Sequence, residues 1–303
     1  MDKQKFNKPV LNLDEKIELL KQRWLIIKNV DMAKDKLKHI GYFRLSWYFK
    51  FFQDLETDIF NEWTTFDDVI YLYNFDSELR IFTMDMIEKI EISLKANIND
   101  YMTEKYGIFW YLDTDLFNKD IKNWADIYDK LINRINEIVE KKKSPFVEKY
   151  FEKYDEKNLP SWMLFEELTI WNVSNIFNII NEEDSINIAS VYDTYYWDLK
   201  RWLRLIVQVR NICAHHWRLW NNDLHIRLRK KDVILKDKFV LEKTSKWEVA
   251  KNYYNFFLVA SYLLKIIDNK FNVVDRLDYL FWKYPNVDKH KMWFTENRKE
   301  KFT

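Results

Sequence analysis

The residues best suited to chemistry lie between positions 210 and 218. This stretch holds two guanidinium groups, an amide and two imidazoles, contributed by Arg210, Arg218, Asn211, His215 and His216. An imidazole exchanges protons near neutral pH, and a guanidinium binds phosphate oxygens through paired N–H donors. Because this combination can move protons at a phosphate without a metal ion, the stretch predicts cleavage of RNA.

The spacing of these residues predicts how they are presented. Apolar residues before the stretch recur at helical spacing, so it should continue an amphipathic helix. Asn211 and His215 lie four positions apart, and Arg218 and Asn222 extend the same side of that helix. Arg210 lies about 100° from Asn211 around the axis, so it flanks this side and is not in line with His215. Either the helix distorts near His215, or Arg210 and His215 meet across a cleft, for example one made with a second subunit.

A purely structural explanation of the same residues stays open. Arginine and histidine are common near the C-terminus of a helix, because they complement its dipole and bond its last carbonyls. An arginine with a histidine five positions later also occurs by chance. The neighbouring Asn211, the second imidazole of His216 and the run Arg218–Asn221 make the stretch less generic, and they favour a functional interpretation.

Several ordered segments resemble a known protein family. Arg210–His215 is similar to the Arg-Asn-x-x-x-His motif of HEPN ribonucleases, and its extension to Asn221 resembles the Arg-Asn-x-Cys-Ala-His-His-x-Arg-Leu-Trp-Asn run of Abi-like proteins of bacterial abortive infection. Leu37–Ser46 resembles the N-terminal signature of that family, in which an aromatic pair precedes Arg-Leu-Ser. Leu72–Arg80 resembles its Leu-Tyr-x-Phe-Asp-x-Glu-Leu-Arg element, followed by Ile87–Glu91 at the expected place, and Leu159–Met163 resembles its Leu-Pro-x-Trp segment.

The resemblance implies a fold, a reaction and residue roles. HEPN nucleases are helical bundles that generally pair two motifs across a dimer or between two internal copies; this chain has one clear copy, which implies a homodimer with a composite cleft. There His215 would act as general acid or base while the ribose 2′-hydroxyl attacks the phosphate. Arg210 would stabilise charge on the phosphate oxygens, Asn211 would orient the imidazole or the phosphate, and His216 is the alternative imidazole. Products would carry 2′,3′-cyclic phosphates, with neither metal nor cofactor required.

The resemblance also implies a biological setting. A growth-arresting toxin of phage defence must be restrained by a partner, and a small noncoding RNA, acting as an antitoxin or a guide-like RNA, is a reasonable one. Two rival interpretations remain. One is a noncatalytic RNA-binding HEPN module, in which Arg210 and His215 only grip phosphate and the chain holds an RNA or a protein partner. The other is a helical adaptor that binds no nucleic acid.

Composition predicts the fold class and bounds the location. Only 2 glycines and 4 prolines occur in 303 residues, and a chain with so few turn-forming residues should be all-α. Residues 1–12 lack the apolar core of a secretory signal, no apolar run is long enough to span a bilayer, and a single cysteine, Cys213, permits no internal disulfide. These features predict a cytoplasmic protein without membrane contact, and Cys213 is expected to be a small core residue.

The expected organisation is a HEPN-like helical bundle with additional N-terminal helices. The predicted ranges are an N-terminal helical extension over 1–65, a HEPN-like domain over 66–284 and a tail over 285–303, with one continuous domain over 1–284 as the alternative. A small hairpin within Leu224–Val240 is a further option. Helices are expected over Asp14–Lys28, Asp31–Ile40, Tyr42–Gln53, Phe66–Tyr106, Asn118–Lys143, a segment opened by Pro160, Trp197–Trp217 and Trp247–Lys270.

Charge is unevenly distributed in a chain whose formal net charge is only +1. Between Lys200 and Lys231 nine basic residues stand against one acid, Asp223. A basic patch around the candidate site would attract a polyanion and release its counterions. Indole rings beside the patch could stack on bases. The sequence therefore predicts an RNA-binding surface formed by Arg204, Arg218, Trp217, Trp220 and Asn221.

Two further pairs of charged residues invite interpretation. Asp76 and Arg80 are four residues apart in a helical pattern, which allows an intrahelical ion pair. Because both belong to a family-like element, we expect them to hold the long helix against the helix of the Arg210–His215 motif. Glu88 and Glu91 could support Arg210 or another arginine of the motif, since a buried guanidinium needs a partner. They are not expected to hold a metal ion, because no histidine or cysteine accompanies them.

Overall fold

The chain is almost entirely helical. The computed structural model describes residues 9–243 and 247–294, and among these it contains twelve α-helices, three short 3₁₀ helices and one two-stranded hairpin. The predicted all-α class is therefore confirmed. Within the described residues, no helix combines the length and the apolar character that crossing a bilayer requires.

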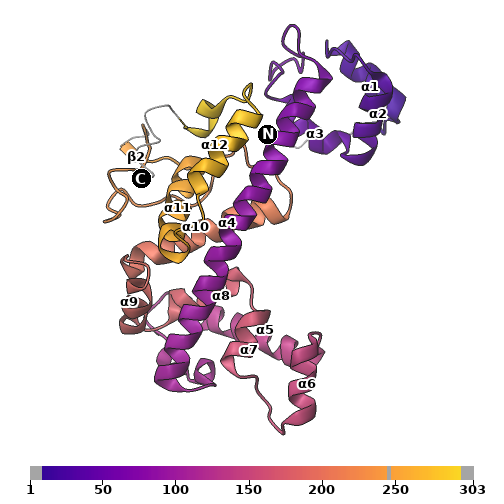
Figure 1. Cartoon of the computed structure of the whole chain (residues 1–303). Coiled ribbons are helices and arrows are strands. Elements are labelled where there is room, and N and C mark those ends of the chain that lie inside the picture. The colour runs from indigo at the N-terminus through magenta and orange to yellow at the C-terminus, as the bar shows by residue number, and fades with distance from the viewer. Residues whose placement is uncertain (1–8, 244–246, 295–303) are drawn as a thin grey trace, which may run out of the picture. The chain divides into compact units, whose positions relative to one another are not determined.

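The chain divides into two compact units. The first contains the chain up to Leu79 together with Leu280–Val287, and the second contains Arg80–Tyr279 and the residues that follow Asp288. The boundary falls inside two helices, α4 (Phe66–Tyr106) and α12 (Val273–Lys283). Figure 1 shows α4 as one unbroken helix, and its bounds coincide with the helix expected from the sequence.

The first unit is built from α1 (Leu13–Gln22), α2 (Val30–His39), α3 (Tyr42–Phe49) and the beginning of α4. Helix α1 starts at a capping box, in which the Asn12 side chain accepts from the Glu15 N–H and the Glu15 carboxylate accepts from the Asn12 N–H. It is shorter than expected because Trp24 adopts a left-handed conformation with φ 70°. Gly41, with φ 92°, separates α2 from α3, as the sequence predicts.

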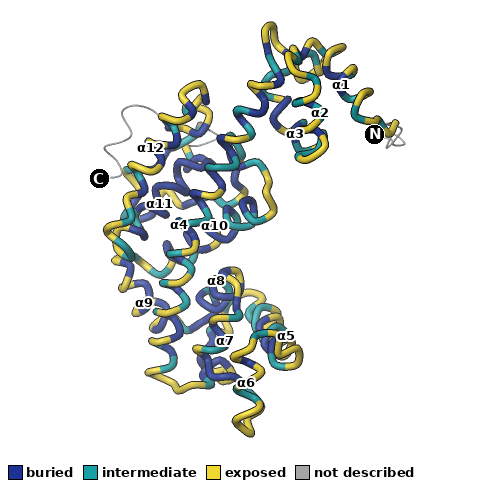
Figure 2. The backbone as a smooth tube through the Cα atoms, turned by 45° about the vertical axis from the view of Figure 1, so that its right-hand side comes forward, coloured by how far each residue is buried: buried dark blue, intermediate teal, exposed yellow. Residues whose placement is uncertain are grey.

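The second unit contains most of the remaining helices, which surround a core on α10 (Tyr196–Ala214). Helix α10 contacts α8 (Ile170–Ile179), α9 (Glu182–Ser190) and α11 (Tyr253–Ile267). Helix α11 is coloured almost entirely as buried in Figure 2. Trp202 of α10 is fully buried. The other elements of this unit are α5 (Trp124–Lys141), α6 (Pro145–Lys153), α7 (Ser161–Glu167) and the 3₁₀ turns at Trp110–Leu112, Thr114–Leu116 and Lys289–Met292.

The hairpin lies just after the segment in which it was expected. Strands β1 (Leu241–Lys243) and β2 (Trp247–Val249) pair antiparallel, with Leu241 opposite Val249. Residues 224–240 instead form an irregular loop. Asp232 draws this loop inward, because its carboxylate accepts the N–H groups of Ile234 and Leu235. A hairpin after the motif helix is thus confirmed, but its position within Leu224–Val240 was wrong.

Candidate functional site

The last turn of α10 presents the histidines of the motif. The His215 N–H still donates to the Asn211 carbonyl at 3.0 Å, so helical hydrogen bonding continues up to this residue. His216 then turns the chain with φ 57°, and the N–H groups of His216 and Trp217 donate to the carbonyls of Cys213 and Ile212. These two bonds form a Schellman motif, in which glycine usually occupies the left-handed position. His216 occupies that position here, so it has a conformational role in ending α10.

His215 is exposed beside an exposed indole. Its ring centroid lies 5.5 Å from that of Trp217, and the planes are inclined by 31°. Trp217 remains 60% exposed, so one face of the pair is available to a ligand. The arrangement agrees with an imidazole that reaches solvent and with an aromatic ring that could receive a base.

Arg210 is left without a counterion. Its side chain is half-buried, and its only hydrogen bond to a described residue runs from Nη1 to Asn211 Oδ1 at 3.5 Å, the long limit of such bonds. Among the described residues, no carboxylate forms an ion pair with it. A partly buried guanidinium in this state is available to an anion.

Arg210 and His215 do not meet within one chain. The two residues are five positions apart, which places their side chains about 140° apart around a regular helix. Because α10 stays helical through Ala214, no distortion brings them together, and no hydrogen bond joins them among the residues that the structure describes. Of the two arrangements that the sequence allowed, a distorted helix is not found, and a cleft made with a second subunit stays a prediction.

Helix α4 supports the turn after the motif. Arg80 is only 5% exposed, and its Nη1 donates to the carbonyl of Trp217 at 3.5 Å. One helical turn earlier in α4, Asp76 is completely buried, and its carboxylate accepts a hydrogen bond from the Tyr48 hydroxyl at 2.6 Å. The contact of Arg80 agrees with the expectation that this element holds the long helix against the motif helix.

The proposed support of Arg210 by α4 carboxylates is not found. Glu91 forms an ion pair with Lys95 one turn further along the helix, at 3.1 Å. Glu88 is exposed. The expectation assumed that Arg210 is buried and therefore needs a carboxylate partner. Arg210 is only half-buried, and the sequence alone does not reveal this.

The predicted RNA-binding residues separate into accessible and buried ones. Arg204 is exposed on α10, and Trp217 is exposed at its end. Arg218 and Asn221 are half-buried and bonded to each other, because the Arg218 Nη2 donates to the Asn221 carbonyl at 3.2 Å. Trp220 is only 4% exposed, so the prediction that it stacks on RNA is corrected: a ring in the core cannot receive a base.

The basic patch is weaker than the sequence suggested. Arg227 forms ion pairs with Glu242 at 2.7 Å and Glu248 at 3.2 Å, both on the hairpin. Lys200 is used internally, since its ammonium donates to the Asn178 carbonyl at 3.0 Å and lies over the Tyr196 ring. Burial lowers the pKa of Lys200. The exposed positive charge is therefore concentrated on Arg204 and the residues that follow Arg227.

Two buried carboxylates lie just outside the window in which charge was counted. Asp198 and Asp232 are each 1% exposed. Asp232 accepts from Trp202 Nε1 at 2.8 Å, and Asp198 accepts from the Val233 N–H at 3.2 Å, so together they attach the loop over 224–240 to α10. Burial raises the pKa of Asp232 to about 6, and the nearby Asp198 carboxylate contributes to that shift. A charge window wider by two residues at each end would have found both.

The family model described as Abi-like protein matches residues 35–221. The chain belongs to the Abi-like protein family. Membership suggests a function in abortive infection. No curated protein and no solved structure gives a significant match.

The Abi-like match covers both helices that form the candidate site. It begins in α2, contains α4 and α10, and ends at Asn221, directly after the Schellman turn. The match therefore includes Arg80, Arg210 and His215. It excludes the loop attached by Asp232, the hairpin and α11.

Proposed function

We propose that this Abi-like protein is a metal-independent endoribonuclease of the HEPN superfamily that acts in abortive infection. The observation that supports the proposal best is the state of Arg210. Its guanidinium is partly buried yet has no carboxylate partner among the described residues, five positions before an exposed imidazole. A structural arginine at this depth would normally be paired, whereas a phosphate-binding arginine must be free to pair with its ligand.

The proposed chemistry is transesterification at an RNA phosphate. The ribose 2′-oxygen bonds to phosphorus while the bond from phosphorus to the 5′-oxygen breaks, giving a 2′,3′-cyclic phosphate and a 5′-hydroxyl. A base takes the proton of the 2′-hydroxyl, and an acid gives a proton to the departing 5′-oxygen. His215 fills one of these roles. Arg210 stabilises the charge that develops on the phosphate oxygens. Asn211 orients one of these oxygens.

A homodimer gives this chemistry the geometry that one chain lacks. Arg210 and His215 point about 140° apart on α10, so one phosphate contacts both most easily when a second copy completes the cleft. The second copy also supplies the second imidazole that an acid–base pair needs. A restraining partner, with a small noncoding RNA as our candidate, would keep such an enzyme inactive until infection.

The test is a cleavage assay of total RNA in excess EDTA. Wild type should produce fragments with 2′,3′-cyclic phosphate ends. His215→Ala should cleave roughly 10²–10⁴-fold more slowly, and Arg210→Ala roughly 10²–10³-fold more slowly. The matched control is His225→Ala, because His225 is an exposed histidine outside the motif, and it should cleave as wild type does.

Two results would overturn the proposal. One is wild-type activity that requires a divalent cation. The other is a protein that, stripped of any co-purified RNA, cleaves nothing but still binds RNA in the wild-type, Arg210→Ala and His215→Ala forms. The second result would establish the noncatalytic RNA-binding module instead.

A further inference from the structure

The polar side of α10 extends far beyond the motif. Arg201, Arg204, Gln208, Asn211 and His215 recur at intervals of three or four residues, which places them on one side of the helix. All of them are half-buried or exposed, whereas the opposite side is buried in the core. Asn211 and His215 are therefore the last members of a stripe that begins near the start of the helix.

Three arginines gather where this stripe begins. Arg201 Nη1 donates to the Arg227 carbonyl at 2.8 Å, which attaches the following loop to α10. Burial lowers the pKa of Arg201, and the nearby Arg229 and Arg204 guanidiniums lower it further. Arg204 and Arg229 are exposed, and neither forms an ion pair with a described residue. We call these three residues the arginine cluster.

One acid lies close to the arginine cluster and does not neutralise it. Asp198 is 1% exposed, and its carboxylate accepts from the Val233 N–H. Burial raises its pKa, and the charges of Arg229 and Arg201 oppose that rise. Three guanidiniums beside one buried carboxylate leave excess positive charge facing solvent, and the planar guanidinium fork matches the oxygens of a phosphate group.

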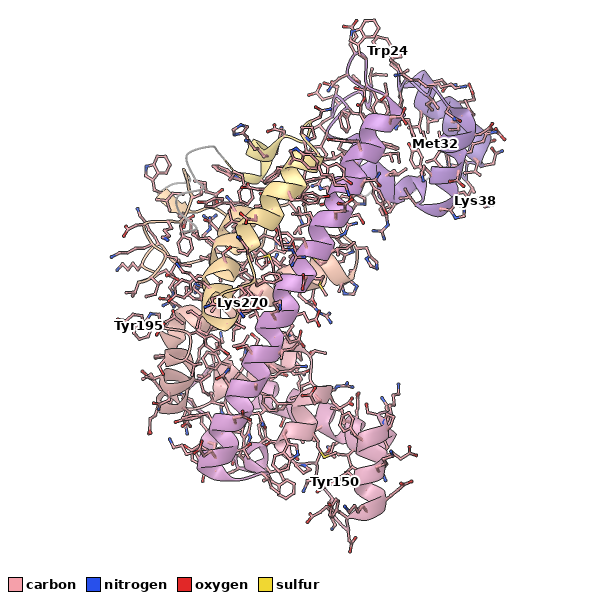
Figure 3. The ribbon with its side chains drawn as sticks, in the orientation of Figure 1. Trp24, Met32, Lys38, Tyr150, Tyr195 and Lys270 are labelled. Atoms are coloured by element: carbon pink, nitrogen blue, oxygen red, sulfur yellow. The ribbon has the colours of Figure 1, made fainter. Side chains whose placement is uncertain are left out.

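Exposed aromatic rings stand at both ends of the stripe. At its beginning, Tyr195 and Trp197 stack with centroids 4.9 Å apart and planes inclined by 14°. These two rings are 44% and 38% exposed, and Figure 3 shows Tyr195 at the beginning of α10. Trp197 lies one turn before Arg201. At the other end, the exposed Trp217 lies against His215.

We propose that α10 is a track for single-stranded RNA, in which the arginine cluster binds a backbone phosphate and the Tyr195–Trp197 pair stacks a base. This inference rests on the proposed function and names the path of its substrate. Alternating cations and accessible aromatic faces are what a single strand requires, since its bases are unstacked and its phosphates continuous. A duplex would present no base to the rings.

The track has a defined length. Arg204 lies eleven residues before His215, which corresponds to about 16 Å along a helix. A stacked strand advances about 3.4 Å per nucleotide and an unstacked strand advances further, so the arginine cluster contacts a phosphate no more than about five nucleotides from the cleaved one. A dinucleotide therefore reaches the motif without reaching the cluster.

The test is binding of a fluorescein-labelled twelve-nucleotide oligouridine with 2′-O-methyl groups throughout, followed by fluorescence anisotropy. This probe has no free 2′-hydroxyl, so binding is measured without cleavage. Arg204→Ala and Arg229→Ala should each weaken binding roughly tenfold and reduce the slope of log affinity against log salt by about 0.7. Trp197→Ala should weaken binding by a similar factor without changing that slope.

The matched control is Arg134→Ala. Arg134 is a half-buried arginine on α5 that pairs with Glu137 at 3.2 Å, and its removal should leave binding unchanged. A 2′-O-methyl uridine dinucleotide should bind Arg204→Ala and wild type equally. Far-ultraviolet circular dichroism of every variant should match wild type, because Arg204 and Arg229 are exposed.

The outcomes separate this inference from the nuclease proposal. If Arg204→Ala and Arg229→Ala bind the twelve-nucleotide probe as Arg134→Ala does, the track is overturned, whatever the cleavage assay shows. Failure of wild type to bind the probe at low salt also overturns it. If the variants lose binding while stripped wild type cleaves nothing, the track stands and the nuclease proposal fails.

Discussion

Two arginines of the Abi-like region illustrate two uses of the same side chain. Arg80 of α4 is 5% exposed and donates to a backbone carbonyl of the turn after α10. Arg210 of α10 is half-buried and reaches only a neighbouring amide, at 3.5 Å. The Arg80 guanidinium is used to hold the fold together, whereas the Arg210 guanidinium can still pair with an anion. Arg80 of α4 therefore holds the structure together, whereas we propose that Arg210 of α10 binds a ligand.

The largest effect should come from breaking the α4 element. Asp76→Ala removes a fully buried carboxylate and leaves the Tyr48 hydroxyl, itself in the core, without its acceptor. We expect the free energy of unfolding in urea to fall by about 3–5 kcal/mol. Glu88→Ala, on the exposed side of the same helix, is the control and should change it by less than about 0.5 kcal/mol. The comparison breaks down if Arg210→Ala destabilises the protein as much as Asp76→Ala does.

Two neighbouring tryptophans sharpen the distinction between core and site. Trp220→Ala should lower the free energy of unfolding by about 3 kcal/mol or more, because Trp220 is 4% exposed and its loss opens a cavity. Trp217→Ala should change it by less than about 0.5 kcal/mol, because that ring is 60% exposed. The opposite order is expected for binding of the oligouridine probe. Equal destabilisation by the two changes would contradict the assignment.

The loop attached to α10 should show a pH dependence of its own. The pKa of Asp232 is raised from 3.8 to about 6, so folding favours the protonated form. The stabilisation is complete below about pH 4 and is lost as the pH rises through 6. A shift of this size corresponds to on the order of 3 kcal/mol.

Asp232→Asn tests that dependence, because the amide keeps an acceptor oxygen but does not titrate. Urea unfolding of this variant should vary less with pH between 4 and 6 than wild type does. Asp223→Asn, which alters an exposed acid of the same segment, should behave like wild type. A wild-type profile that rises through this interval would contradict the direction of the shift.

The smallest expected effect concerns the left-handed residue of the Schellman turn. His216→Gly removes a Cβ from a position with φ 57°, and it should stabilise the protein by up to about 1 kcal/mol. RNA cleavage should be retained, since we assign the reaction to His215. If His216→Gly abolishes cleavage while His215→Ala does not, the roles of the two imidazoles are reversed.

The sequence predicted the helices better than their ends. Helix α4 was predicted with its observed bounds, because its apolar positions hold helical spacing from Leu72 to Tyr101. Helix α1 ends before its predicted limit because Trp24 takes a left-handed conformation, which no local pattern in a chain with two glycines announces. The hairpin was displaced because buried Asp232, a tertiary feature, determines where the preceding loop goes.

The position of the candidate site residues at a helix end was predictable, but the contacts of the residues around them were not. The histidines and Arg210 follow from spacing, and their position at a helix end was foreseen. Burial decided the rest: Trp220 moved to the core, Arg227 was neutralised by two glutamates from the hairpin, and Glu91 paired with Lys95. Each of these depends on which chain segments approach one another, and one-dimensional spacing does not contain that information.

The first unit has a consequence for synthesis of the chain on the ribosome. It includes Leu280–Val287, and the Tyr284 hydroxyl donates to Glu78 at 2.6 Å while its ring packs edge-on against Phe75. A nascent chain that has made α1 to α4, which ends at Tyr106, must wait for about 180 more residues before the contacts of Tyr284 form. At about 5–20 residues per second this delay is roughly 10–40 s. The unit that is begun first is therefore completed late, and truncated translation products lack a complete first unit.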